Sequence, residues 1–251
     1  MVDNRYATAL VIGSVLSLLA TVYLSVGVGT QHWYRYNSPQ VNHDSSNVSE
    51  LREDFINGDF EEKIYSETMY RLNGTLGLWW RCIQVPSRSQ SHWFREPDPT
   101  LETQCVSFTL PQQFSLKLKY DGNHSSEDLL RTYLWRSQFL LPLVSLALVF
   151  LSGLVGVCAC LCRSFTPTFG VGVLHLLAGL CSLGTVSCFL AGMDLLHQYS
   201  KPPGGVEGSL GWSLYLALIS FPLQMMAAAL FLWAAKSHRK NYTRIIAYRV
   251  A

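Results

Sequence analysis

The chain has 251 residues, of which only 14% are charged, against roughly 25% in an ordinary soluble domain. The deficit comes from four stretches without Asp, Glu, Lys or Arg, each long enough for the roughly 18–25 apolar residues of a membrane span. This pattern excludes a soluble single-core protein, a disordered chain and a nucleic-acid-binding protein. The stretches are Tyr6–Tyr34, Ser137–Cys162, Ser164–Met193 and Gly208–Ala235.

The first stretch predicts a membrane span over residues 7–29, after a short head of residues 1–6. A cleaved signal peptide is the alternative, but its apolar region has only about 7–15 residues. This stretch is longer and leads into Trp33 and Tyr34, aromatic residues typical of the headgroup layer. We therefore expect a retained span.

The remaining apolar cores predict spans over residues 139–161, 169–193 and 210–235. On one side of the membrane, residues 30–138 then form a large loop and residues 194–209 a short one. The order of the spans places both chain termini on the other side.

Charge indicates which side is cytoplasmic. The tail, residues 236–251, carries five basic residues and no acid, while Arg5 lies in the head and Arg163 in the connection 162–168. Short segments rich in Lys and Arg stay in the cytoplasm. We expect a multi-pass protein with cytoplasmic termini and two outer loops.

N-glycosylation signals agree with this topology. The large loop contains three Asn-X-Ser/Thr triplets, which begin at Asn47, Asn73 and Asn123. A fourth begins at Asn241 in the tail, where we expect no sugar. Single triplets are common by chance, but three in a loop already placed outside by charge support the prediction.

The cysteines divide by compartment. Cys82 and Cys105 are the only two in the large loop, and an even pair in an oxidising compartment predicts one disulfide. Closing such a loop contributes roughly 3 kcal/mol in the chain-entropy model. Three more stand where the second span meets the cytoplasm, and either reversible palmitoylation or packing as small residues explains them. They are Cys158, Cys160 and Cys162, whose helical spacing does not suit a metal site.

The large loop also predicts a small sheet. Residues 75–85 and 104–110 are rich in aromatic and β-branched residues and are bounded by turn residues, and residues 29–36 extend the first span as a third strand. A short helix is expected within residues 50–70, whose acids indicate a solvated face. Residues 129–136 predict a helix continuous with the second span.

The large loop also carries a motif made of a tryptophan, a Gly-Leu-Trp triplet and two cysteines, and a basic residue stands just before the second span. The motif residues are Trp33, Gly77, Leu78, Trp79, Cys82, Cys105 and Arg136, the last preferred to Arg131. In this loop of a four-span chain, the motif resembles that of the claudin superfamily, the PMP22/EMP/MP20/claudin type. The resemblance implies a membrane α+β fold, in which a four-helix transmembrane bundle carries a small antiparallel extracellular β-sheet.

The resemblance further implies a non-enzymatic plasma-membrane protein at cell–cell contacts that modulates adhesion or paracellular permeability. Its partners would be membrane lipid and claudin-like proteins, in cis or in trans, with self-association possible and with no cofactor, metal or nucleic acid. Two gaps, Trp33 to Trp79 and Cys82 to Cys105, are longer than in claudins, and the terminal Val250-Ala251 differs from the Tyr-Val of many claudin tails. These departures leave open a second function, that of an auxiliary regulatory subunit of a membrane channel or receptor.

Nothing in the sequence favours catalysis, since nucleophile-elbow, dinucleotide, phosphate-loop and HExxH patterns are absent. Within the spans, His175 and Gln224 are polar. We expect them to bond between helices, as buried polar groups in membranes usually do.

Overall fold

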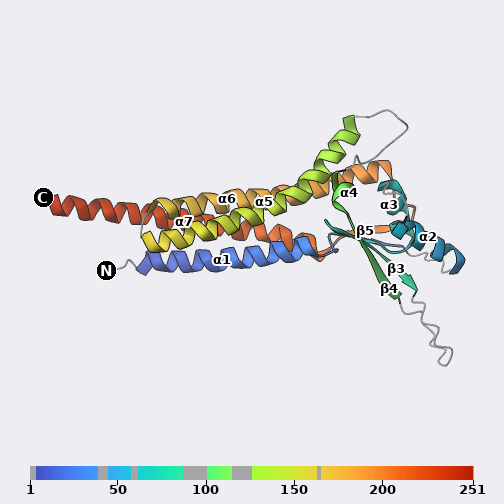
Figure 1. Ribbon diagram of the computed structural model, residues 1–251, viewed down its shortest axis with the longest axis horizontal. Coiled ribbons are helices and arrows are strands. Elements are labelled where there is room, and N and C mark those ends of the chain that lie inside the picture. Colours follow the sequence, from blue (N-terminus) through green and yellow to red (C-terminus); the bar gives the residue numbers. More distant parts are fainter. Residues whose placement is uncertain are drawn as a thin grey trace, which may run out of the picture. The chain divides into compact units, whose positions relative to one another are not determined.

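The computed structural model describes residues 4–38, 45–57, 62–86, 101–114, 126–162 and 165–250 (Figure 1). The chain divides into two compact units, which we name the helix unit and the sheet unit and describe separately. The helix unit comprises Met1–Gly27, Gln138–Ser187 and Tyr215–Ala251, and the sheet unit comprises Val28–Ser137 and Cys188–Leu214.

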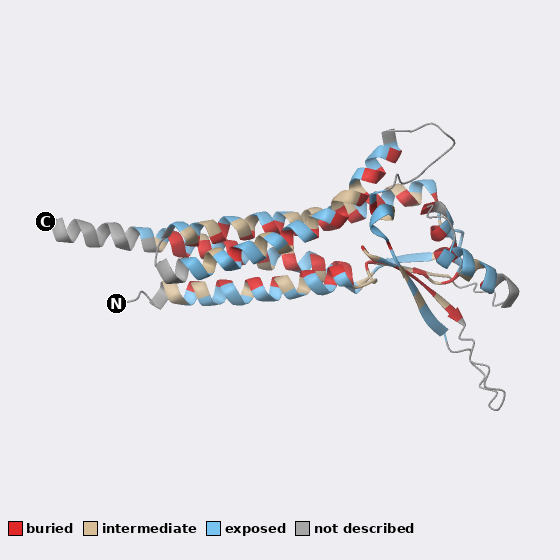
Figure 2. Ribbon diagram, in the orientation of Figure 1, coloured by how far each residue is buried: buried red, intermediate tan, exposed pale blue. Residues whose placement is uncertain are grey.

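Long helices supply the helix unit and confirm the predicted four-span fold. They are α1 (Asn4–Gly29), α5 (Ser126–Cys162), α6 (Phe165–Tyr199) and α7 (Trp212–Val250). Their most apolar windows have mean hydropathies of 1.8 to 2.4, and all four are long enough to cross a membrane. In the helix unit, buried and exposed positions alternate along each helix (Figure 2). Large apolar residues such as Val11, Leu18 and Phe150 are exposed, as a lipid-facing surface requires.

All four helices extend beyond the predicted spans, and α7 continues to Val250. α5 begins at Ser126, so residues 129–136 are helical as expected, and α6 continues to Tyr199. Extension of an existing helix is favourable because each added residue gains an internal hydrogen bond without a new nucleation cost. The membrane borders themselves stay predictions.

Small residues let the helices approach closely. A Cβ atom on Gly172 of α6 would lie 2.7 Å from Leu232 Cγ of α7, and one on Gly13 of α1 would lie 3.2 Å from Phe231 Cζ. Membrane helix interfaces favour small residues because contact there depends on packing rather than on exclusion of water.

His175 and Gln224, for which bonding between helices was expected, differ in their surroundings. His175 is buried, with Nε2 lying 2.6 Å from Ser17 Oγ of α1 and Nδ1 lying 2.8 Å from Ser152 Oγ of α5. Gln224 is fully buried on α7, and its amide atoms have no hydrogen-bond partner among the described residues. The expected bonding between helices therefore holds for His175 and not for Gln224.

The sheet unit is built on an antiparallel sheet of five strands in the order β4-β3-β2-β1-β5. The strands are β1 (Tyr34–Asn37), β2 (Thr75–Leu76), β3 (Trp80–Pro86), β4 (Leu101–Ser107) and β5 (Glu207–Leu210). β5 lies between α6 and α7 and pairs with β1, from Tyr34 opposite Leu210 to Asn37 opposite Glu207. The small antiparallel sheet of the predicted fold class is thus confirmed.

The extent of two predicted strands was wrong. The run 75–85 forms two strands, because the chain turns between Leu76 and Trp80. The second strand begins earlier than expected and ends at Ser107, after which α4 (Leu110–Phe114) begins. The Gln112 side chain accepts a hydrogen bond from the Thr109 N–H at 2.9 Å, half of a capping box, and this cap explains why a helix starts here.

Among the described residues between β1 and β2 lie two helices, rather than the one expected. They are α2 (Ser45–Asn57) and α3 (Glu62–Arg71). Arg52 Nε of α2 donates to Gln104 Oε1 of β4 at 2.6 Å, and Arg81 Nη2 of β3 donates to the Phe55 carbonyl of α2 at 3.1 Å. These bonds hold α2 on the face of the sheet that carries Arg81 and Gln104.

Candidate functional site

A buried tryptophan fixes the start of β1. The ring of Trp33 is fully buried, and its centroid lies 5.0 Å from that of Phe189 in α6. The Trp33 N–H donates to the Leu76 carbonyl at 3.0 Å, and its carbonyl accepts from the Gly211 N–H at 2.9 Å. Trp33 therefore joins β2, α6 and the segment that follows β5.

The Gly-Leu-Trp triplet makes the break between β2 and β3. A Cβ atom on Gly77 would lie 2.7 Å from Gln31 Cα and 2.7 Å from the Thr30 carbonyl oxygen, so only glycine fits against this backbone. Leu78 is buried, and Trp79 is half-buried with its carbonyl accepting from the Phe108 N–H at 2.8 Å. The triplet thus attaches the sheet to the chain directly after α1.

The predicted disulfide is confirmed. Cys82 of β3 and Cys105 of β4 are bonded and lie directly opposite each other in the register of the two strands. Cys82 is buried and Cys105 is exposed. The bond joins the edge strand β4 to its neighbour β3.

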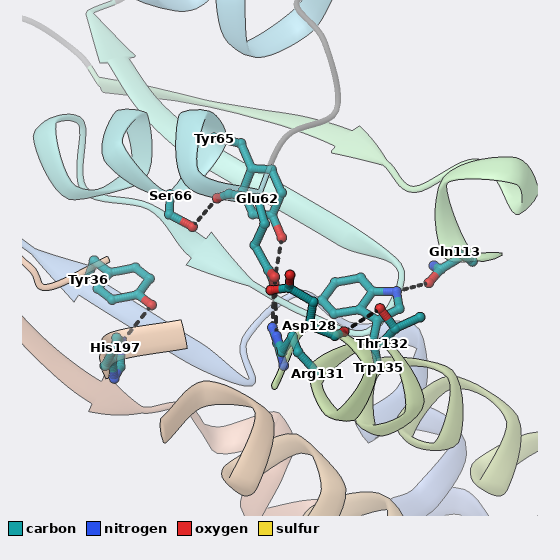
Figure 3. Close-up of polar contacts among 10 residues, drawn as sticks. All are labelled: Tyr36, Glu62, Tyr65, Ser66, Gln113, Asp128, Arg131, Thr132, Trp135 and His197. Carbon is teal, nitrogen blue, oxygen red and sulfur yellow. Dashed lines mark hydrogen bonds and ion pairs between the residues drawn. The ribbon is translucent and has the colours of Figure 1, made fainter. Parts of the chain in front are cut away.

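A buried ion pair joins α3 to α5 (Figure 3). Arg131 Nε donates to Glu62 Oε2 at 3.2 Å, and Arg131 Nη2 donates to Glu62 Oε1. The Tyr65 hydroxyl also donates to Glu62 Oε1, at 3.1 Å. A carboxylate removed from water needs such partners. Burial, and then the adjacent Glu62 carboxylate, raise the pKa of Tyr65 well above its usual value.

One helical turn after Arg131, Trp135 bonds to α4. Its Nε1 donates to Gln113 Oε1 at 2.8 Å, and Gln113 Nε2 donates to the Leu78 carbonyl at 3.4 Å. The rings of Phe108 and Trp135 meet edge-on, with their centroids 5.2 Å apart. The Trp135–Gln113 bond joins α5 to α4 (Figure 3), and the Gln113 bond to Leu78 joins α4 to the Gly-Leu-Trp turn.

The two arginines before the second predicted span have different partners. Arg136, the residue preferred from the sequence, is half-buried, and its Nη2 donates to the Phe114 carbonyl at 2.6 Å. Arg131 is buried in the ion pair with Glu62. Which of them corresponds to the basic residue of the family motif stays a prediction.

A second buried arginine, Arg81, lies among aromatic rings. The guanidinium carbon of Arg81 lies 4.9 Å from the Phe55 ring centroid, 5.1 Å from that of Tyr65 and 5.9 Å from that of Phe108. Cations bind favourably over aromatic faces, most strongly when water is excluded. Burial lowers the pKa of Arg81 from its usual value, and the residue stays a cation at physiological pH.

The residues that tie α3 to its neighbours were not predicted from the sequence. Glu62 belongs to the acids that were assigned to a solvated face, but it is buried because Arg131 and Tyr65 bind it. The Tyr70 hydroxyl donates to the Ser200 carbonyl at 3.0 Å. Only Arg131 carried a signal, as a charge among the mostly apolar residues 129–135.

Some predicted modification residues cannot be placed. Asn123 lies outside the described residues, and the side chains of three others do as well. These are Asn47, Cys160 and Cys162. Cys158 is exposed on α5, and Asn73 lies in the turn between α3 and β2.

Comparison with protein-family models matches residues 18–233 to the family described as PMP-22/EMP/MP20/Claudin tight junction. The match extends from α1 into α7 and includes all five strands. The chain belongs to this family. It is therefore a claudin-like membrane protein with four spanning helices, and the resemblance inferred from the motif is confirmed.

Proposed function

We propose that this claudin-like protein acts without catalysis at cell–cell contacts of the plasma membrane, where it modulates adhesion or paracellular permeability. The observation that carries the proposal is the sheet built around Trp33, the Gly77 turn and the Cys82–Cys105 bond, in a chain of the claudin family. A rigid layer of this kind suits recognition of another protein. Its buried ion pair and the Trp135–Gln113 bond join elements of the same unit, which suits a structural role better than chemistry.

In this proposal the sheet unit is extracellular and both termini are cytoplasmic. The basic tail and the three glycosylation triplets support that orientation. The partners are membrane lipid and claudin-like proteins, in cis or in trans, and a second copy of the chain is one of them. Cys158, Cys160 and Cys162 serve as cytoplasmic palmitoylation sites, which the exposure of Cys158 supports.

A second function is favoured by the two helices between β1 and β2. α2 and α3 are held on one face of the sheet by the bonds of Arg52 and Arg81. A sheet face covered by its own chain is closed to a neighbouring copy. An auxiliary subunit that regulates a channel or receptor in the same membrane does not need to bind a second copy of itself through this face. The covering of the face by α2 and α3 therefore favours the second proposal.

One experiment separates the two proposals. The full chain is expressed in cells without tight-junction strands, and freeze-fracture images and transepithelial resistance are compared with those of cells expressing a strand-forming claudin. Strands together with changed resistance support the junction role. Absence of both, with a defined channel or receptor co-purifying stoichiometrically and gating differently in the presence of the chain, supports the auxiliary role.

A further inference from the structure

The Asn73-Gly74 pair is required by the turn in which it lies. Asn73 has a φ of 52°, in the left-handed region that Asn tolerates better than most residues. The Gly74 N–H donates to the Met69 carbonyl at 2.9 Å, which is the long hydrogen bond of a Schellman cap at the end of α3. A Cβ atom on Gly74 would lie 2.4 Å from Met69 Cβ, so this position needs glycine.

The two ends of the Asn73 amide have different surroundings. Oδ1 accepts a hydrogen bond from the Ser38 N–H at 2.6 Å, which ties the turn to the end of β1. The residue is partly exposed. No described residue accepts a hydrogen bond from Nδ2, and this nitrogen is not buried. Nδ2 therefore faces solvent, while Oδ1 fixes the plane of the amide.

We propose that Asn73 is at once the left-handed cap of α3 and the anchor of an N-linked glycan, with Oδ1 bound to the protein and Nδ2 bound to the sugar. In the transfer, Nδ2 forms a bond to the anomeric carbon of a lipid-pyrophosphate-linked oligosaccharide. The bond from that carbon to pyrophosphate breaks, Nδ2 loses a proton, and the lipid pyrophosphate leaves. The inference rests on the proposed outer placement of the residues between α1 and α5.

The position of Asn73 in the sheet gives this glycan a consequence. β1 follows α1 and ends at Asn37, and the Tyr36 N–H donates to the Gly74 carbonyl at 2.8 Å. The anchor therefore lies at the end of β1 that is farther along the strand from α1. A large hydrated glycan at this end of the sheet, which we name the sheet tip, hinders a protein on an opposing cell from contacting the tip.

The first test asks whether Asn73 carries sugar. The full chain is expressed in cultured cells, and its mobility is compared before and after enzymatic removal of N-glycans for wild type, Thr75→Ala, Thr75→Ser and Asn73→Asp. Thr75→Ala and Asn73→Asp should lose one glycan, and Thr75→Ser, which keeps the acceptor triplet, should match wild type. If Thr75→Ala keeps the wild-type mass while the enzyme still removes other glycans, the inference is overturned and the outer topology stands. If the enzyme changes no mass at all, the proposed topology fails with it.

The second test separates the cap from the sugar. Asn73→Asp and Asn73→Ala both lose the glycan, but only aspartate keeps an acceptor for the Ser38 N–H and tolerates the left-handed backbone. Amide hydrogen exchange at the end of β1 should be about tenfold faster in Asn73→Ala than in Asn73→Asp. Equal exchange in the two variants would overturn the capping role.

The third test concerns shielding of the sheet tip. Two cell populations expressing differently tagged chains are mixed, and proximity between the tags across the cell border is measured for wild type and Thr75→Ala. Removal of the glycan should raise this proximity, and an unchanged signal overturns the shielding consequence. Thr75→Ser is the matched control because it changes the same side chain and keeps the sugar.

Discussion

Replacing Arg131 alone should destabilise the sheet unit far more than replacing Arg136 on the same helix. Arg131→Met keeps much of the length of the side chain but removes both donors to Glu62. The Glu62 carboxylate, whose side chain is 0% exposed, is then left with the Tyr65 hydroxyl as its remaining side-chain donor. A buried charge with so few partners is the most costly outcome of removing one member of an ion pair.

The structure sets the expected magnitude. Loss of one partner of a buried pair costs roughly 3–5 kcal/mol, which raises the population of the opened sheet unit roughly a hundred- to several-thousand-fold. The double variant Glu62→Leu/Arg131→Met removes both charges. It should recover most of the loss, because apolar replacement of a buried pair is often neutral or stabilising by about 1–4 kcal/mol.

Hydrogen exchange followed by mass spectrometry on the full chain in detergent measures this directly, using peptides from α3 and β3. Arg136→Met is the matched control, since Arg136 is half-buried on the same helix and its side chain donates to the carbonyl of Phe114. Loss of the Arg136 hydrogen bond should lower the unfolding free energy by about 1 kcal/mol. The reasoning is refuted if Arg131→Met exchanges like Arg136→Met, or if the double variant is no more protected than Arg131→Met.

Further variants test the rest of the sheet unit. Trp33→Ala should lose roughly 3–5 kcal/mol of unfolding free energy by emptying a fully buried site, measured by thermal unfolding, and a loss under 1 kcal/mol would contradict the packing described. Gly77→Ala should lose about 1–3 kcal/mol because its Cβ has no room, whereas Gly204→Ala, with open space around it, should be neutral; equal effects would argue against the close approach. Cys105→Ser should abolish the mobility difference between reduced and non-reduced chain and cost roughly 3 kcal/mol, and a difference that survives would refute the assigned disulfide. Burial raises the pKa of Tyr65, so the stability it contributes as a neutral phenol is fully present below a pH of about 10 and is lost as the pH rises further. Tyr65→Phe should remove this alkaline loss, and unfolding curves of equal pH dependence would contradict it.

The helix unit was predictable because its signal is local. A membrane span must satisfy its backbone within one helix, so an apolar run without charges is nearly sufficient evidence. The disulfide was also predictable from the sequence, since Cys82 and Cys105 had no other candidate partners in the loop. Both predictions needed only the count and position of residues.

The ion pair and the strand break depend on contacts between distant parts of the chain. Glu62 stands in a run rich in acids, and nothing nearby distinguishes it from Glu67, which is exposed. Its burial depends on Arg131, which lies on another helix. The run 75–85 is rich in strand-forming residues, and it breaks at Gly77, where the backbone at Gln31 leaves no room for a side chain.

The pairing of β1 with β5 sets an order on biosynthesis. β1 is made early, but its partner, which begins at Glu207, is translated only after α6, on the order of ten to thirty seconds later at about 5–20 residues per second. Over that interval β1 has an open edge, while β3 and β4, which are close in sequence, can already pair. The sheet can therefore be completed only after α6 has been made and the segment that follows α6 has reached the same side of the membrane as β1. A chain truncated before Glu207 leaves an unpaired strand edge, a feature that favours aggregation.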